Sequence, residues 1–133
     1  MGSKIMTASE IERAGTAFLV QHLKAKGRSV QKSNRETFGK TFDLIVDGIP
    51  AEVKAKGKSV DKFDFFVFSE KQFAALRSGE QFIVFLVLGV LEPGKTEIIE
   101  IPSACLRNFE PKVWTQYYWD KGMVDAIRVQ LQS

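Results

Sequence analysis

The chain has 133 residues, about the size of one domain, and its balance of 44% hydrophobic and 26% charged residues is typical of soluble globular proteins. A single cysteine and a single histidine exclude an intramolecular disulfide bond and a four-ligand zinc site. The most apolar stretch, residues 82–91, is too short to cross a membrane as a helix and is expected to be a buried strand. We therefore expect no membrane partner and, without a signal peptide, a cytoplasmic protein, with residues 1–8 as a tail and residues 9–133 as one domain.

The charge is distributed unevenly along the chain. Residues 1–62 contain 12 Lys or Arg against 7 Asp or Glu, whereas residues 63–133 contain 7 against 9. A basic half of this kind fits a polyanionic partner such as nucleic acid. The same excess also fits an ordinary solvated surface, so charge alone leaves both interpretations open.

The chain begins with a predicted helix over residues 9–26. Thr7 or Ser9 can cap its first turn, apolar residues recur at helical spacing, and Gly27 follows as a C-terminal stop. A short strand over residues 29–32 and a polar loop over residues 33–40 come next.

Two strands, residues 42–46 and 49–55, are predicted to form a hairpin. The Asp47-Gly48 dipeptide between these alternating runs is a strong signal for a type I′ turn. A loop rich in Lys and Gly follows over residues 56–63.

Downstream, the chain alternates between apolar strands and short capped helices. The expected elements are strands at residues 64–68, 81–90, 96–101 and 124–130 and helices at residues 70–77 and 102–108. Residues 112–119 are ambiguous. With the N-terminal elements, the order α-β-β-β-β-α-β-β-α-β predicts an α/β fold with a central mixed sheet flanked by helices.

The turn of the hairpin determines which residues of its strands face one another. Asp43 falls opposite Glu52, and Thr41 opposite Lys54, and paired residues point to the same face with Cβ atoms roughly 5 Å apart. The other face holds seven apolar residues, which are Phe42, Leu44, Val46, Ile49, Ala51, Val53 and Ala55. We expect this apolar face to be core, while the polar face presents two carboxylates and a lysine.

Two neighbouring carboxylates repel one another unless their charge is compensated. Mg²⁺ compensates it, because this ion binds one or two carboxylates together with waters and substrate phosphates. Lys54, one step along the strand from Glu52, is placed to orient or deprotonate a water, or to hold a phosphate. The alternative is a solvated polar face on which Lys54 only neutralises a carboxylate, and spacing alone does not decide between the two.

With these residues in place, the chain resembles the PD-(D/E)xK nuclease superfamily, in particular its small Holliday-junction-resolvase-like and restriction-endonuclease-like domains. The resemblance lies in Asp43, an interval of eight residues and then Glu52-Val53-Lys54, on strands that follow a helix. It implies a restriction-endonuclease-like domain that uses Mg²⁺, or Mn²⁺ in its place, to hydrolyse phosphodiester bonds of DNA, including structured or branched DNA. Asp43, Glu52 and the backbone carbonyl of Val53 would bind the metal, and Lys54 would assist the attacking water.

Two further residues are candidates for the same site. Many members of the superfamily carry a glutamate on the first helix, and counting back from Leu23 gives Thr16, so that Glu12 is a displaced equivalent one turn earlier. Gln72, on the helix after the aromatic strand, is a possible polar site residue, although we favour a surface glutamine there.

The sequence also predicts partners. Lys56, Lys58 and Lys62 form a basic rim after the site that fits contacts to DNA phosphates, or else only a soluble loop. A homodimer is expected because cutting two strands needs two sites, and residues 63–68 and 114–119 are its candidate interfaces. The aromatic run at residues 114–119 is expected to fill a core or an interface in preference to stacking on bases.

Two classes of function remain open at this point. The first is a DNA endonuclease, which would act alone or with other proteins of a defence or recombination system. The second is a catalytically silent nuclease-fold module that binds nucleic acid or a protein partner.

Overall fold

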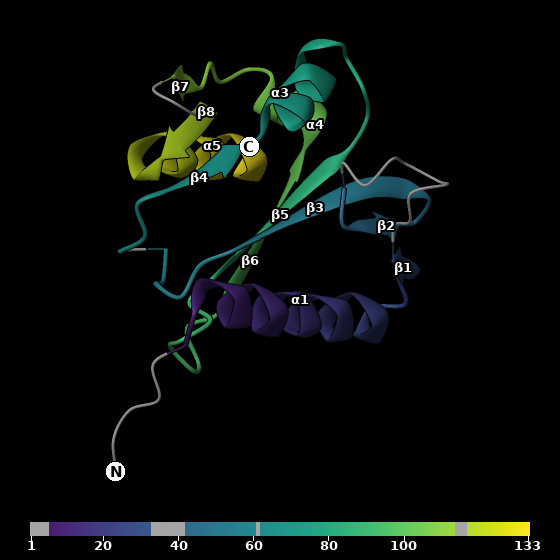
Figure 1. Ribbon diagram of the computed structural model, residues 1–133, viewed down its shortest axis with the longest axis vertical. Coiled ribbons are helices and arrows are strands. Elements are labelled where there is room, and N and C mark those ends of the chain that lie inside the picture. The colour runs from purple at the N-terminus through teal and green to yellow at the C-terminus, as the bar shows by residue number, and fades with distance from the viewer. Residues whose placement is uncertain (1–5, 33–41, 61, 114–116) are drawn as a thin grey trace.

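The fold is built on a mixed five-stranded sheet (Figure 1). The computed structural model describes residues 6–32, 42–60, 62–113 and 117–133. The strand order is β1-β2-β3-β5-β6, with β3 and β5 parallel and the other neighbours antiparallel. These strands are β1 (Val30–Lys32), β2 (Leu44–Val46), β3 (Ile49–Ala55), β5 (Ile83–Leu88) and β6 (Glu97–Pro102). The expected mixed α/β architecture is confirmed.

Helix α1 (Ala8–Ala25) covers one face of this sheet (Figure 1). Thr7 caps the helix, because its side chain accepts the N–H of Glu10 and its own N–H donates to the Glu10 carboxylate. Gly15 is buried against the sheet, where an added Cβ would lie only 2.5 Å from Cβ of Ala55. The missing side chain therefore lets α1 approach β3 closely. The core between helix and sheet consists of Leu19, Leu23, Leu44, Val46, Ala51, Val53, Ile83, Phe85 and Val87.

A second, smaller sheet and further helices cover the opposite face. This sheet has the order β4-β8-β7, and its core is aromatic, with the Trp119 ring stacked on Phe66 at 5.2 Å between centroids. The elements on this side are β4 (Phe65–Phe68), β7 (Lys112–Val113), β8 (Tyr117–Asp120), α3 (Glu70–Arg77), α4 (Ser103–Leu106) and α5 (Lys121–Gln132). Because side chains alternate along β5, that strand contributes to both cores.

The hairpin formed by β2 and β3 has the predicted register. Asp47 and Gly48 both have positive φ, 52° and 80°, as a type I′ turn requires. Val46 pairs with Ile49 and Leu44 with Ala51. The Asp47-Gly48 signal therefore identified both the turn and the pairing.

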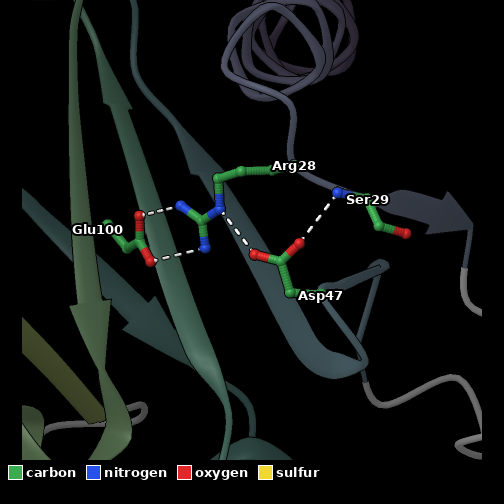
Figure 2. A network of polar contacts seen from close by, with 4 residues as sticks. All are labelled: Arg28, Ser29, Asp47 and Glu100. Carbon is green, nitrogen blue, oxygen red and sulfur yellow. Dashed lines mark hydrogen bonds and ion pairs between the residues drawn. The ribbon is translucent and has the colours of Figure 1, made fainter.

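A polar network holds this turn in place (Figure 2). Arg28 donates through Nε to Asp47 at 2.9 Å and through its two terminal nitrogens to Glu100 at 2.5 and 3.0 Å. The other carboxylate oxygen of Asp47 accepts the N–H of Ser29 at 2.9 Å. One guanidinium thus connects the segment after α1, the hairpin turn and strand β6.

The predicted last strand, residues 124–130, is wrong, because the chain is helical there as α5. The buried side chains of this segment, Val124 and Ile127, are three residues apart, which is helical spacing. In the helix, Ile127 is buried beside Val124, whereas Val129 and Leu131 are exposed at 68% and 38%. Asp120 caps the helix by accepting the N–H of Met123.

Two other expectations need correction. Strand β4 does not join the central sheet but pairs with β8, a partner more than 40 residues away in sequence, so the predicted order of elements is incomplete. Phe42 is expected on the apolar face with Leu44, but it packs in the aromatic core against Phe82, at 4.9 Å between centroids. The strand begins only at Leu44, so the alternation of β2 does not extend back to Phe42.

The predicted loop at residues 33–40 lies outside the described residues, as do Thr41 and Trp114. Within the described ranges, the helices are too short or too polar to cross a membrane.

Candidate active site

The candidate site lies on the face of β3 that is turned away from α1. Ala51 and Val53 enter the core under α1, so alternation directs Glu52 and Lys54 to the other face. There α3 and β4 lie over them, and Glu52 is only 7% exposed. The polar face of the hairpin is therefore not a freely solvated surface.

Asp43 lies next to Glu52, as the register predicts. The ladder between β2 and β3 ends at the Leu44–Ala51 pair, and Asp43 immediately precedes it. One Asp43 oxygen, Oδ2, accepts the N–H of Val53 at 3.3 Å. Asp43 is exposed, so the pair of carboxyl groups extends from the surface into the interior.

The environment of Glu52 is unfavourable for its charge. Burial raises the pKa of Glu52 to about 8, the charge of Lys54 opposes this rise, and the charge of Asp43 and a hydrogen bond to it add to the rise. Its Oε1 atom is buried and receives no hydrogen bond from an N–H or O–H group of the described residues. Lys54 contacts the other oxygen, Oε2, at 3.3 Å, so a charged Glu52 leaves Oε1 without a partner among the described residues.

Lys54 and Gln72 complete the polar cluster. Lys54 Nζ lies 3.3 Å from Glu52 Oε2 and donates to Gln72 Oε1 at 3.2 Å, while Gln72 Nε2 donates to Glu52 Oε2 at 2.7 Å. The ammonium also lies 5.7 Å from the centroid of the Phe68 ring. Glu52, Lys54 and Gln72 thus fix one another's positions.

The expectation that Gln72 is a surface residue is wrong, because Gln72 is only 7% exposed. It occupies the third position of α3, and its Oε1 atom accepts the N–H of the capping residue Ser69 at 3.1 Å. The Ser69-x-x-Gln72 capping box was the sequence signal that could have identified this constrained side chain.

Glu12 lies on α1, which packs on the face of β3 opposite to Glu52 and Lys54. It lines a cavity of about 230 Å³ together with Glu52 and Lys54, and also a larger one of about 670 Å³ together with Asp43 and Thr16. Glu12 therefore shares one cavity with Glu52 and another with Asp43, and its role as the displaced helix glutamate stays a prediction.

The three lysines of the basic rim differ in their surroundings. Lys56 lines the 230 Å³ cavity, and burial, followed by the charge of Lys54, lowers its pKa, while Asp64 opposes the shift. Lys58 lines a neighbouring cavity of about 320 Å³. Lys62 lies 3.8 Å from a carboxylate oxygen of Glu92, so its charge is partly compensated within the chain.

The aromatic residues near the C-terminus pack inside the chain. Trp119 is fully buried, Tyr117 stacks on Phe73 at 3.9 Å between centroids, and Phe66 and Phe68 are buried as well. The expectation of core filling is confirmed for Trp119. The two segments expected to form a dimer interface pair with each other as β4 and β8.

The donor set fits a hard divalent cation. In the described residues, no group of three or more His, Cys, Asp or Glu gathers closely enough to hold a metal by itself. Mg²⁺ does not need such a group, because it keeps several waters and uses one or two carboxylates together with substrate phosphates. The adjacent Asp43 and Glu52 carboxyls, with the unsatisfied Oε1 atom, meet this requirement.

Comparison with known proteins adds no relative. No family model matches this chain, and no curated protein and no solved structure matches it. The resemblance to the PD-(D/E)xK nucleases therefore stays a prediction from the sequence.

Proposed function

We propose that this chain is a restriction-endonuclease-like domain that hydrolyses phosphodiester bonds of DNA with Mg²⁺. One observation supports this most strongly. Glu52 is a buried carboxylate with an unsatisfied oxygen, it lies beside a second carboxylate, and it contacts an ordered lysine. When Glu52 is charged, this arrangement destabilises the fold, and a bound cation offsets the cost.

Asp43 and Glu52 would hold the metal through their carboxylates, and the carbonyl of Val53 is a third candidate ligand. The N–H of Val53 points toward Asp43, and the N–H and C=O of one residue lie on the same side of a strand. When bound, the metal supplies a positive charge that stabilises the charge developing on the phosphate oxygens and favours deprotonation of water.

Lys54 would not bind the metal but would act on the water and the phosphate. The ammonium is fixed between Glu52 and Gln72 and faces the same cavity as Glu12. From there Lys54 orients the attacking water and the scissile phosphate, and its charge offsets the negative charge of the transition state. The Lys56 and Lys58 ammonium groups continue the positive surface along which the DNA backbone lies.

A cut through both strands of a duplex needs a second site, so a homodimer on DNA remains part of this proposal. Of the segments expected to form its interface, β4 and β8 pair with each other, and Phe66, Phe68 and Trp119 are buried within one chain, whereas Phe65 is exposed.

The proposal is tested by cleavage of labelled single-stranded, duplex, supercoiled and branched DNA with Mg²⁺, Mn²⁺ or EDTA. The wild type should cut with either metal and not in EDTA. Lys54→Ala should lower the rate by about 10²–10⁴ with little loss of DNA affinity, because one positioned group is removed from a surface that makes many phosphate contacts. Lys24→Ala, at the exposed far end of α1, is the matched control and should cut normally.

Two results would contradict the proposal. If Lys54→Ala cuts as fast as the wild type, the site is wrongly assigned. If the wild type cuts no DNA with any metal, the chain is a silent module that only binds its partner.

A further inference from the structure

A second cavity adjoins the candidate active site. It measures about 320 Å³, within the range of small-ligand pockets, and Lys56 lines both this cavity and the one that holds Glu52 and Lys54. Its lining is apolar over Ile11, Phe63, Phe65 and Leu91 and polar at Lys56, Lys58 and Asp64. Lys56 therefore connects this cavity with the one that Glu52 and Lys54 line.

The cavity exposes apolar surface that the chain does not cover. Phe65 is 42% exposed and Leu91 is 47% exposed, although both are large apolar residues. Phe63 is buried and forms the inner part of the wall. Uncovered apolar side chains that share one cavity mark a binding surface more often than an accident of packing.

The walls of the cavity are held in place by the backbone. Val90 N donates to Lys56 O and Leu91 N to Gly57 O, both at 3.1 Å, so the segment after β3 is bonded to the segment after β5. A Cβ at Gly57 would lie 2.7 Å from Leu91 Cδ1. Glycine at this position therefore allows the leucine to close one side of the cavity.

We propose that this cavity binds one unpaired nucleobase of the strand that is cut, so that the substrate is DNA with an unpaired base next to the scissile bond. This inference rests on the proposed function and specifies its substrate class. A base offers the flat apolar surface that packs against Phe65 and Leu91. Lys56 and Lys58 at the same cavity match the charge of the adjoining phosphates.

The polar groups of the cavity also fit a base. The Lys56 ammonium lies 5.7 Å from the centroid of the Phe65 ring, so charge and aromatic surface meet at one wall. Asp64 provides a carboxylate that can accept N–H groups from the edge of a base. A base stacked within an intact duplex cannot enter the cavity, because it would first have to leave its stack.

The test compares Phe65→Ala and Phe65→Leu with Phe18→Ala. Phe18 is the matched control, since it is a phenylalanine of similar exposure, 43%, on α1 outside this cavity. Binding of a labelled single strand and of a blunt duplex is measured by fluorescence anisotropy with Ca²⁺ in place of Mg²⁺, and thermal unfolding verifies that each variant is folded. A parallel set of single strands carries one abasic nucleotide at successive positions.

Both Phe65 variants should lose about 5- to 100-fold in affinity for the single strand, because stacking of a base on an aromatic ring is removed. Their affinity for the duplex should not change, and Phe18→Ala should bind both like the wild type. For the wild type, an abasic nucleotide at one position of the single strand should lower the affinity by a similar factor. For Phe65→Ala, the same abasic nucleotide should cause no further loss of affinity.

The two proposals fail differently. If the wild type cuts DNA and both Phe65 variants bind the single strand as tightly as it does, the base pocket is refuted and the nuclease assignment stands. The base pocket is also refuted, and the nuclease assignment stands, if the wild type cuts DNA and an abasic nucleotide weakens its binding at none of the positions. If the wild type binds neither single strand nor duplex, both proposals fall together.

Discussion

At the scale of single residues, Glu52 both lowers the stability of the fold when it is charged and is a candidate metal ligand. Glu52 is directed toward the interior by the alternation of β3, and one oxygen of its carboxyl group has no hydrogen-bond partner among the described residues. Gln72 and Lys54 satisfy the other oxygen. A functional site that keeps a buried polar group of this kind lowers the folding stability of the protein. Glu52 should therefore destabilise the metal-free protein when it is charged.

Glu52→Gln should be at least as stable as the wild type in EDTA at pH 8.5. The folded-state pKa of Glu52 is raised to about 8, so the wild type loses stability as the pH rises from the unfolded-state pKa near 4.5 through that value, whereas glutamine does not titrate. Thermal unfolding in EDTA measures this directly. Added Mg²⁺ should raise the unfolding temperature of the wild type only. A variant much less stable than the wild type in EDTA would show that the charged Glu52 stabilises the fold.

At the scale of elements, the position of the site depends on α1 and on the hairpin. Helix α1 brings Glu12 to the cavity that Glu52 and Lys54 line, and Gly15 allows this helix to pack closely on β3. The hairpin brings Asp43 next to Glu52 because the type I′ turn fixes its register. A substitution in either element therefore tests the geometry without touching the reacting groups.

Gly15→Ala should destabilise the protein by about 1–3 kcal/mol, because its Cβ would lie 2.5 Å from that of Ala55 and the packed core must shift. Gly122→Ala is the control, since its Cβ would have Asp120 Oδ1 at 3.6 Å, an ordinary contact, and alanine favours a helix. Urea unfolding should show a loss for the first variant and none for the second. Equal stability of Gly15→Ala and wild type would contradict the close approach of α1.

Asp47→Asn should destabilise the protein at neutral pH and not in acid. The hydrogen bond from Arg28, followed by that from the Ser29 N–H, lowers the folded-state pKa of Asp47. The stability that the Asp47 carboxylate contributes to the fold is therefore present above the unfolded-state pKa of about 4. This stability is lost as the pH falls through the folded-state pKa, which is lower still.

Chemical unfolding at several pH values tests this, and asparagine is a suitable replacement because it tolerates the positive φ of Asp47. The control is Asp125→Asn, whose exposed partner Lys121 lies one helical turn away and should contribute little. A loss of stability for Asp47→Asn that is equal in acid and at neutral pH would point to the backbone of the turn and not to its charge.

At the scale of the whole molecule, local signals were sufficient for α1, α3 and the hairpin, but not for α5. The capped helices and the hairpin follow from Thr7, Ser69 and Asp47-Gly48, whose effects extend over only a few residues. The pairing of β4 with β8 joins segments that lie far apart in the sequence, so no pattern within either segment predicts it. Helix α5 stands where a strand is predicted: its buried residues, Val124 and Ile127, are at helical spacing, and Val129 is exposed.

The same distinction applies to the site. The register of the hairpin follows from its two-residue turn, so the sequence alone is enough to predict that Asp43, Glu52 and Lys54 lie together. Gln72 and the cavity beside Phe65 depend on how α3 and β4 lie over the central sheet, which the sequence did not reveal. Residues brought to a site by long-range packing are therefore the ones that sequence patterns leave open.

The central claim is that Asp43 and Glu52 form a divalent cation site, and titration of the metal-free protein with Mn²⁺ in a calorimeter tests it most directly. The wild type should bind one ion for each 15.0 kDa chain. Asp43→Ala should not bind Mn²⁺, because half of the carboxylate pair is lost. Lys54→Ala should still bind the ion, because it keeps both carboxylates. The account is contradicted if the wild type binds no Mn²⁺, or if Asp43→Ala binds it as tightly as the wild type.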